Sequence, residues 1–216
     1  MQPMIATAGP LATADADGIC QSQTPSAGNL TINGALATSG VATMDNPRRV
    51  LITTAGNESS RTFTIYGTNW SGNTVSETMT GPNATTGQSV LDYKTVTRVA
   101  ISGNAAGALT VGTNGVGGSQ WVRFDGWSTG GVAAQLTVSG TVNYTLQQTM
   151  DDPNSAFVTI TPMAMTWVDC SDSSVAAATA TAQTNYLFPP MFARIKINSG
   201  TGTVTGTFVQ SGVTNL

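Results

Sequence analysis

Few residues of this chain could do acid–base chemistry. Its 216 residues include no histidine, so a Ser-His-Asp triad is excluded and proton transfer would fall to carboxylates, tyrosine or lysine. Asp151 and Asp152 are the only adjacent acidic residues, and two carboxylates can hydrolyse a glycoside when they flank its bond. Because Asp-Asp-Pro is more typical of a turn, we interpret residues 151–153 as a turn. We therefore predict no catalytic residue and no enzymatic activity.

The sequence also lacks a strong motif for binding a metal or a cofactor. Asp15 and Asp17 stand two apart, as at the start of a calcium loop, but the later carboxylates of such a loop are missing. The glycine-rich stretch 111–119 leads into an aromatic segment and not into a phosphate-binding helix, which favours a linker. Cys20 and Cys170 have no metal-ligand spacing, and we expect two reduced, buried side chains and not a bridge. The sequence predicts neither a metal nor a cofactor.

The charge argues against two classes of partner. Eight Lys and Arg stand against 11 Asp and Glu, which gives a net charge of −3. Only Arg48 and Arg49 are adjacent basic residues, whereas a nucleic-acid surface needs clustered positive charge. No apolar run approaches the roughly 20 residues of a membrane span, and the first residues lack the pattern of a secretory signal. We expect a soluble, unexported protein that binds neither nucleic acid nor membrane.

The composition is that of strands and turns. The chain contains 36 threonines and 24 glycines, and only 9% of its residues are charged. Threonine favours extended backbone, and glycine supplies tight turns. About five to seven short strands fit in each half at roughly 8–12-residue spacing. We predict an all-β protein of two tandem, small, antiparallel β-sandwich or jelly-roll-like domains.

Shifts in composition divide the chain into three parts. Residues 1–45 have few large apolar side chains and are predicted to form an extended N-terminal arm, although a flexible terminus is an alternative. A first β domain is predicted over 46–115 and a second over 116–216. The second carries an inserted loop region at 154–187. An arm of this kind could lie on its own protein or add a strand to a neighbour.

Alternation of apolar and polar residues locates the strands. Residues 47–69 read as a hairpin around a polar turn, and 72–82 as the third strand. One or two more strands fit in 88–103, followed by another at 107–113. The Ala-rich stretch 173–186 could form a helix after a serine cap. Its threonines, however, make extended backbone as favourable as a helix there.

Two stretches of the chain are nearly alike. Residues 97–113 and 193–209 share an order in which Arg98 matches Arg194 and Ile101 matches Ile197. Two further pairs of matches precede them in the same order, so we predict that the two domains arose by duplication. Both arginines are expected to lay their stems along a sheet and turn their charged ends to solvent or a carboxylate.

An aromatic cluster directly after the glycine-rich stretch is the first candidate for a contact surface. Trp121, Phe124 and Trp127 surround Arg123, and aromatic and arginine side chains dominate compact interfaces. We favour a buried plug between the two domains over an exposed binding site, and a subunit contact would satisfy both. Apolar residues of the predicted arm are further candidates for an interface. The candidate interface residues are Trp121, Arg123, Phe124, Trp127, Ile19, Leu30 and Ile32.

Several motifs follow one another along most of the chain: DGIC, RRV-I-T-AGN and TVGTNGVG-S-WV within residues 14–122, and YTLQQTMDDP (144–153) and the segment 186–212 in the second half. In this order they resemble a group of uncharacterised virion structural proteins of tailed bacteriophages. The Met-rich sequence at 161–167 departs from the pattern. The resemblance implies a virion component of β-sandwich type and no particular site.

Function is therefore expected in assembly. A weakly charged β protein with a long arm is suited to contacts with neighbours. We predict a capsid decoration or cement protein, made in the bacterial cytoplasm, that binds the major capsid protein or other virion proteins. A homo-oligomer is expected, with a trimer favoured. A tail or collar component is the first alternative, and a carbohydrate-binding module for host attachment is the second.

Overall fold

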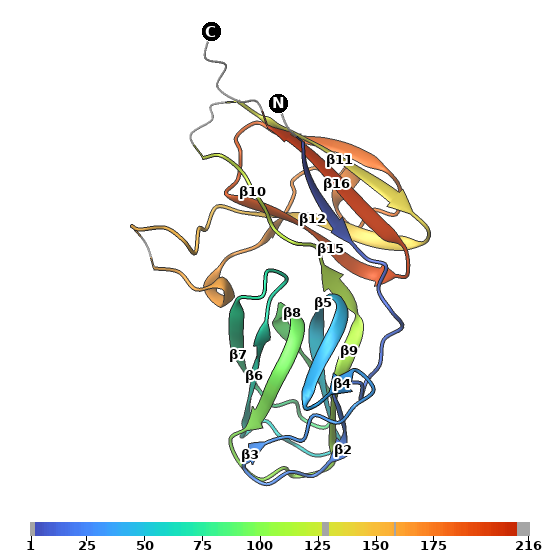
Figure 1. The fold of residues 1–216 in the computed structure, drawn as a ribbon, viewed down its shortest axis with the longest axis vertical. Coiled ribbons are helices and arrows are strands. Elements are labelled where there is room, and N and C mark those ends of the chain that lie inside the picture. Colours follow the sequence, from blue (N-terminus) through green and yellow to red (C-terminus); the bar gives the residue numbers. More distant parts are fainter. Residues whose placement is uncertain (1–2, 127–129, 158, 211–216) are drawn as a thin grey trace. The chain divides into compact units, whose positions relative to one another are not determined.

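The computed structural model describes residues 3–126, 130–157 and 159–210, and it is all-β as predicted (Figure 1). Over these ranges the strands form two open antiparallel sheets, one of 4 strands and one of 12. Two short 3₁₀ turns make up the remaining regular structure of the described residues. None of the described residues forms a helix of the length and apolar character needed to cross a bilayer.

The chain divides into two units that differ from the predicted arm and tandem domains. Unit 1 consists of Met1–Leu11 and Gly117–Leu216, and unit 2 of Ala12–Val116. Unit 2 is thus inserted into the chain of unit 1. The glycine-rich stretch does mark a boundary, but the predicted arm does not stand apart, because its residues are shared between both units.

Unit 2 is built on five main strands. These are β5 (Val41–Thr54), β6 (Thr62–Thr68), β7 (Thr74–Thr80), β8 (Thr86–Ile101) and β9 (Leu109–Gly118), the last of which runs past the unit boundary. Their order in the sheet is β9-β5-β8-β6-β7. Three short strands pair with these: β2 (Cys20–Gln23) with β9, β3 (Gly28–Asn29) with β8, and β4 (Ala37–Thr38) with β5.

The hairpin predicted over 47–69 does not form. Both β5 and β6 pair with β8, which lies between them in the sheet. The polar segment that joins them is held elsewhere, because the buried carboxylate of Glu58 accepts hydrogen bonds from the backbone of Ala106 (2.6 Å) and Gly107 (3.2 Å). The hairpin that does form joins β6 to β7.

The core of unit 2 includes residues that were predicted to belong to the arm. Ile19 is 0% exposed and Leu30 is buried, while Ile32 packs half-buried against the same core. They join the inward residues of β5, β6, β8 and β9. Cys20 lies in this core as a free thiol whose pKa burial raises to about 12. Ile19 and Leu30 therefore stabilise the fold and are not exposed for an interface.

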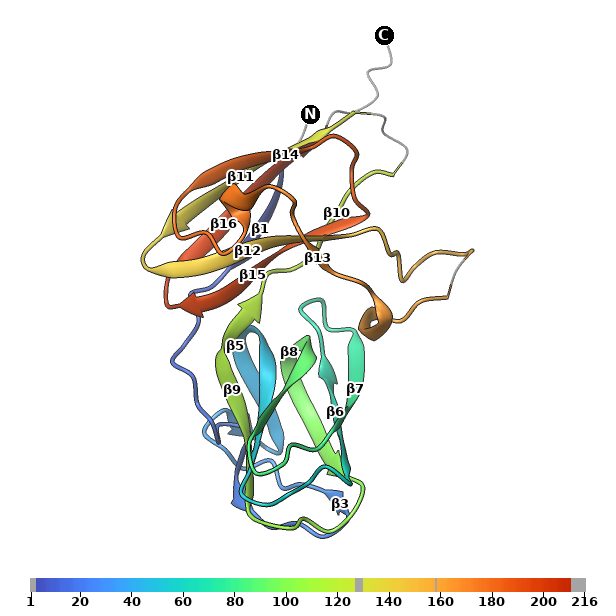
Figure 2. The same ribbon diagram turned by 180° about the vertical axis from the view of Figure 1, so that it is seen from behind.

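Unit 1 is a sandwich of two layers (Figure 2). One layer has the order β1-β16-β11-β14, from β1 (Met4–Ala8), β11 (Val132–Ser139), β14 (Ala182–Tyr186) and β16 (Thr203–Gln210). The other contains β12 (Val142–Thr149), β13 (Val168–Asp169) and β15 (Phe192–Gly200), with β10 (Val122–Arg123) beside β15. The two 3₁₀ turns are η1 (Pro162–Ala164) and η2 (Ser173–Val175).

The first described residues form an edge strand of this sandwich. β1 pairs with β16 along its whole length, from Met4 opposite Phe208 to Ala8 opposite Val204. Ala6 is buried like Ala8, whereas Ile5 is exposed, so β1 alternates as a half-buried strand does. The arm was predicted because this segment has few large apolar residues, but alanine can also fill a core position close to a neighbouring sheet.

The region 154–187 contributes loops and the two strands β13 and β14 to unit 1. The stretch 173–186, for which a helix was considered, contains only the turn η2 and the strand β14. Asp172 accepts a hydrogen bond from the backbone N–H of Ser174 and so caps η2 at 2.9 Å. β14 then pairs with β11, which explains why its alternating polar and buried residues prefer extended backbone.

The structure does not show the predicted duplication. One of the further matches pairs residues 63–68, on β6, with residues 136–141, which begin on β11. β8, which carries Arg98, pairs with β6, but β15, which carries Arg194, does not pair with β11. Arg98 is exposed and Arg194 is buried. The likeness between the two stretches therefore reflects their shared alternation of threonine, glycine and branched residues.

Candidate interaction surface

The predicted aromatic cluster lies on and beside β10 in unit 1. Val122 and Phe124 are buried while Arg123 is exposed, as the alternation of the sequence predicts. Phe124 packs against Tyr186 and Phe208, with ring centroids 6.4 Å and 5.8 Å away. Phe124 is therefore part of the core of unit 1.

Trp121 is half-buried and forms a second aromatic group. Its ring centroid lies 5.3 Å from that of Trp167 and 5.9 Å from that of Phe192. These contacts are internal to unit 1, so they give Trp121 a packing role there. Trp127, the remaining aromatic residue of the prediction, lies outside the described residues.

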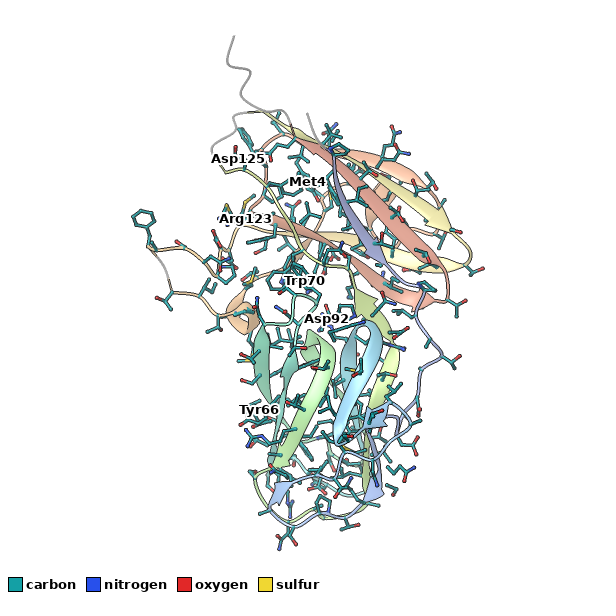
Figure 3. All side chains as sticks on the ribbon, in the orientation of Figure 1. Met4, Tyr66, Trp70, Asp92, Arg123 and Asp125 are labelled. Atoms are coloured by element: carbon teal, nitrogen blue, oxygen red, sulfur yellow. The ribbon has the colours of Figure 1, made fainter. Side chains whose placement is uncertain are left out.

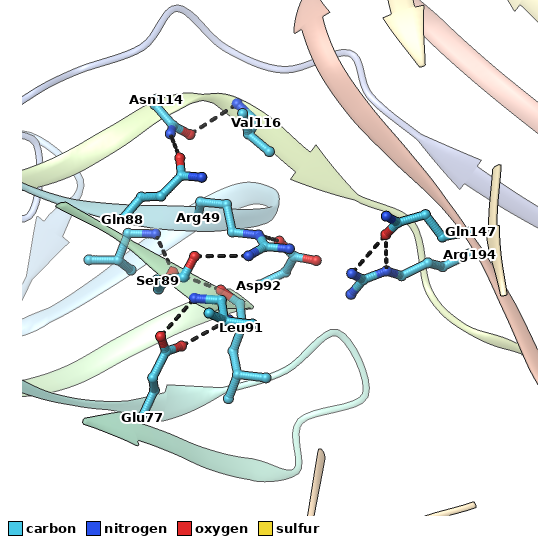
Figure 4. Close-up of polar contacts among 12 residues, drawn as sticks. Arg49, Glu77, Gln88, Ser89, Leu91, Asp92, Asn114, Val116, Gln147 and Arg194 are labelled. Atoms are coloured by element: carbon cyan, nitrogen blue, oxygen red, sulfur yellow. Dashed lines mark hydrogen bonds and ion pairs between the residues drawn. The ribbon is translucent and has the colours of Figure 1, made fainter. Parts of the chain in front are cut away.

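A buried arginine supports this aromatic group. The guanidinium carbon of Arg194 lies 4.2 Å from the ring centroid of Trp167. Its Nε and Nη2 both donate to Oε1 of Gln147, at 3.0 Å and 2.9 Å (Figure 4). Gln147 in turn donates to Asp169 at 2.8 Å. Contact with a ring and hydrogen bonds to an amide stabilise a buried guanidinium, so this network is structural.

Arg123 lies at the rim of an open hollow. Its Nη2 is 3.1 Å from Oδ2 of Asp152, in the loop that follows β12. The hollow has a volume of about 670 Å³, and Phe124, Phe157 and Met191 also line it. Figure 3 labels Arg123 and Asp125, which both line the hollow. The hollow therefore combines apolar side chains with a charged rim.

The adjacent acidic residues shape this loop. Asp151 accepts a hydrogen bond from the backbone N–H of Thr166 at 2.6 Å. Asp152 accepts one from the N–H of Asn154 at 2.9 Å while it pairs with Arg123. Both carboxylates thus hold the backbone in turns, as the Asp-Asp-Pro sequence predicts.

Strand register brings several loops to the same end of unit 1. Thr149 at the end of β12 pairs with Phe192 at the start of β15, and Val132 at the start of β11 pairs with Tyr186 at the end of β14. The loops beyond these strand ends are therefore neighbours. We call residues 122–126, 150–157 and 187–191 together the loop end.

The loop end exposes large apolar side chains. Their exposed fractions are 97% for Phe157, 78% for Leu187, 72% for Phe188 and 64% for Met150. Solvent-facing phenylalanines and leucines gathered at one end of a domain are typical of a contact surface. This is the candidate functional site.

Sequence reasoning missed these four residues. The signal was the run Tyr-Leu-Phe-Pro-Pro at 186–190. Proline cannot donate to a sheet ladder, so two prolines must end the strand and leave the preceding Leu187 and Phe188 in a loop. Met150 directly precedes the turn at 151–153 and Phe157 follows it by four residues, in loop segments from which an apolar side chain reaches a core less easily than from a strand.

The two adjacent arginines are buried and do not form a basic surface. Arg49 lies 2.7 Å from Asp92 and also donates to the carbonyl of Ser89 at 2.8 Å (Figure 4). Arg48 donates to the carbonyl of Asn114 and lies 3.4 Å from Asp45. Both side chains are committed to oxygen partners inside unit 2.

Asp45 is held in its charged form. Burial raises the pKa of its carboxyl, but hydrogen bonds from the backbone of Ala12 and Asn46 and the charge of Arg48 outweigh it. The pKa therefore lies below its ordinary value. Asp45 fixes the segment of chain at Ala12, where unit 2 begins.

The described residues offer no cluster of three or more histidine, cysteine or acidic side chains that could hold a metal ion. Cys20 and Cys170 are both free and buried. No protein-family model matches the chain, and a search of curated proteins finds no match to it. The geometry of the loop end is thus the main guide to function.

Proposed function

We propose that this chain is a non-enzymatic structural protein of a tailed-bacteriophage virion that binds the assembled capsid as a decoration or cement protein. The observation that supports it most is the loop end of unit 1, where Phe157, Leu187 and Phe188 are each at least 72% exposed. The likeness of the sequence to phage virion proteins supplies the class of partner.

The physical argument concerns apolar area. Each large apolar side chain left in water forgoes about 1.5–3 kcal/mol of burial free energy. A partner that covers Leu187, Phe188 and Met150 together recovers this free energy. The ion pair of Arg123 and Asp152 gives the hollow a polar rim, as interfaces commonly have.

The partner in this proposal is the major capsid protein or another virion protein. On this proposal, the protein is located in the virion and is not free in the host cytoplasm. A trimer remains the favoured oligomer because closed symmetry lets three copies present the same surface around an axis of a particle. A tail or collar protein could use the same apolar loops, so it remains the alternative.

The proposal is tested by a double substitution at the loop end. Leu187→Ser with Phe188→Ser should lower the affinity for particles that lack this protein by about thirtyfold or more, since truncation of a hot-spot side chain costs about 2 kcal/mol or more. The matched control is Val90→Ser in unit 2, a side chain that is 61% exposed. Sedimentation with particles measures both. Equal binding by the double variant, the control and the native chain would contradict the proposal.

A host-attachment role as a carbohydrate-binding module has less support. Trp121 and Trp167 pack against each other, and Trp70 is 39% exposed. Sugar binding on tryptophan needs an open ring face, which mutual packing reduces. A change of tryptophan fluorescence on titration with host polysaccharide would favour this second candidate.

A further inference from the structure

A short row of side chains crosses three strands of unit 2. Tyr66 on β6 lies directly opposite Ser76 on β7 and opposite Arg98 on β8. Neighbouring residues Ile65 and Gly67 are buried, so the row faces outward. Figure 3 labels Tyr66 in unit 2.

An irregularity of β8 places two successive side chains beside this row. The register passes from Tyr66 opposite Arg98 to Gly67 opposite Val96, so Thr97 is an extra residue on β8. In a regular strand, Thr97 and Arg98 would face opposite sides, but both are exposed here. A bulge of this kind redirects side chains and is common beside binding sites.

Tyr66 orients the guanidinium of Arg98. The guanidinium carbon lies 3.6 Å from the centroid of the tyrosine ring, the distance of a stacked cation–π contact. Stacking uses the face of the guanidinium and leaves its N–H groups at the edge. The side chain is thus pre-organised while its hydrogen-bond donors stay available.

The donors of Arg98 have no oxygen partner among the described residues. Arg48, Arg49, Arg61, Arg123 and Arg194 each have one. Arg98 differs from all five, since its described contact is the ring of Tyr66. An arginine fixed in place with its N–H edge uncommitted is suited to capture an anion.

A hollow of about 390 Å³ lies next to this guanidinium. Gly67 and Val75 line it together with the hydroxyl-bearing residues Thr74, Ser76 and Thr97. Thr97 donates its hydroxyl to the carbonyl of Tyr66 at 3.3 Å. The volume lies within the range of small-molecule sites, and hydroxyls can donate to and accept from a sugar.

We propose that the hollow lined by Tyr66 and Arg98 binds an acidic sugar, with the carboxylate of a uronic acid paired to the edge of the guanidinium. A carboxylate matches the two parallel N–H donors of arginine, and one cation suits one negative charge. The hydroxyl-bearing residues of β7 and β8 then face the ring of the sugar. This site is independent of the loop end, which belongs to unit 1.

The test uses the full chain and three probes: trigalacturonate, the neutral trisaccharide of galactose, and poly-glutamate. Calorimetry should show saturable binding of trigalacturonate and an affinity at least about tenfold lower for the neutral sugar, because the charge-assisted hydrogen bonds are lost. Arg98→Gln should lower the affinity for trigalacturonate by about tenfold or more. Arg98→Lys, which keeps the charge but not the paired donors, should fall between them.

Two controls make the result specific. Arg123→Gln removes another exposed arginine and should bind trigalacturonate as the native chain does. Melting temperatures show whether the Arg98 variants are folded, as expected for an exposed side chain. Unchanged binding by Arg98→Gln, or equal affinity for the neutral sugar, would overturn the proposal. Equal affinity for poly-glutamate would assign the site to an acidic protein and would also overturn the assignment to a sugar.

Discussion

Arg123 on β10 lies 3.1 Å from Asp152 in the loop after β12, and this ion pair joins two of the three segments of the loop end. The guanidinium carbon of Arg123 also lies 6.0 Å from the ring centroid of Phe192. The Arg123 side chain is 58% exposed and that of Asp152 is 13% exposed, so the guanidinium is the member of the pair that remains open to solvent and to a partner.

Arg123→Ala should change the free energy of unfolding little and the binding to particles more. An exposed ion pair contributes about 0–1 kcal/mol to stability, whereas a rim residue of a hollow also positions the loop that a partner contacts. Urea unfolding and sedimentation with particles measure the two effects. A loss of stability much larger than about 1 kcal/mol with intact binding would make the pair structural only.

Phe124→Ala should destabilise unit 1 by about 3–5 kcal/mol, the usual result of truncating a buried phenylalanine. Trp121→Ala should cost less, about 1–2 kcal/mol, because the half-buried indole removes less apolar area from water. Chemical denaturation of both variants gives the comparison. A larger loss of stability in Trp121→Ala than in Phe124→Ala would instead make Trp121 the principal core residue.

Deletion of residues 1–8 should destabilise unit 1. The deletion bares the edge of β16 and empties the positions of Ala6 and Ala8, and lost backbone hydrogen bonds at 0.5–1.5 kcal/mol each suggest about 2–5 kcal/mol. Ile5→Ser, on the exposed face of β1, is the matched control and should be nearly neutral. Differential scanning calorimetry measures both. A deletion variant that melts like the native chain would restore the interpretation of these residues as a free arm.

Asp45→Asn should destabilise the chain near neutral pH, and this destabilisation should become smaller as the pH falls. The folded pKa of Asp45 is depressed below the ordinary 3.8, so its stabilisation is present above that value and is lost as the pH falls through the folded pKa. Melting temperatures of the two proteins should therefore converge as the pH falls below the depressed pKa of Asp45. A difference that is constant across this range would assign the effect to lost packing or hydrogen bonds and not to charge.

Local sequence patterns predicted local structure well. The threonine-rich composition predicted an all-β fold, and alternation around Arg123 placed Val122 and Phe124 inward. Strand pairing was not predictable in the same way. β5 and β6 are adjacent in sequence, yet Glu58 anchors the segment between them to Ala106, a contact 48 positions away that no local pattern reveals.

The interpretation of residues 1–45 failed for a related reason. Large apolar residues are sparse there, but Ile19 and Leu30 fill core positions of unit 2, and Ala6 fills one in unit 1. A segment that contributes few side chains to a core built mainly by other strands resembles an arm in sequence. The candidate site was missed because it consists of apolar residues in loops, whereas apolar residues are normally assigned to strands and cores.

Copy number in purified virions tests the central claim most directly. Quantitative mass spectrometry against the major capsid protein should find this chain in salt-washed particles on the order of hundreds of copies, because a decoration protein repeats with the symmetry of the capsid. Absence of the chain from washed particles, or a few copies confined to tails, would contradict the account.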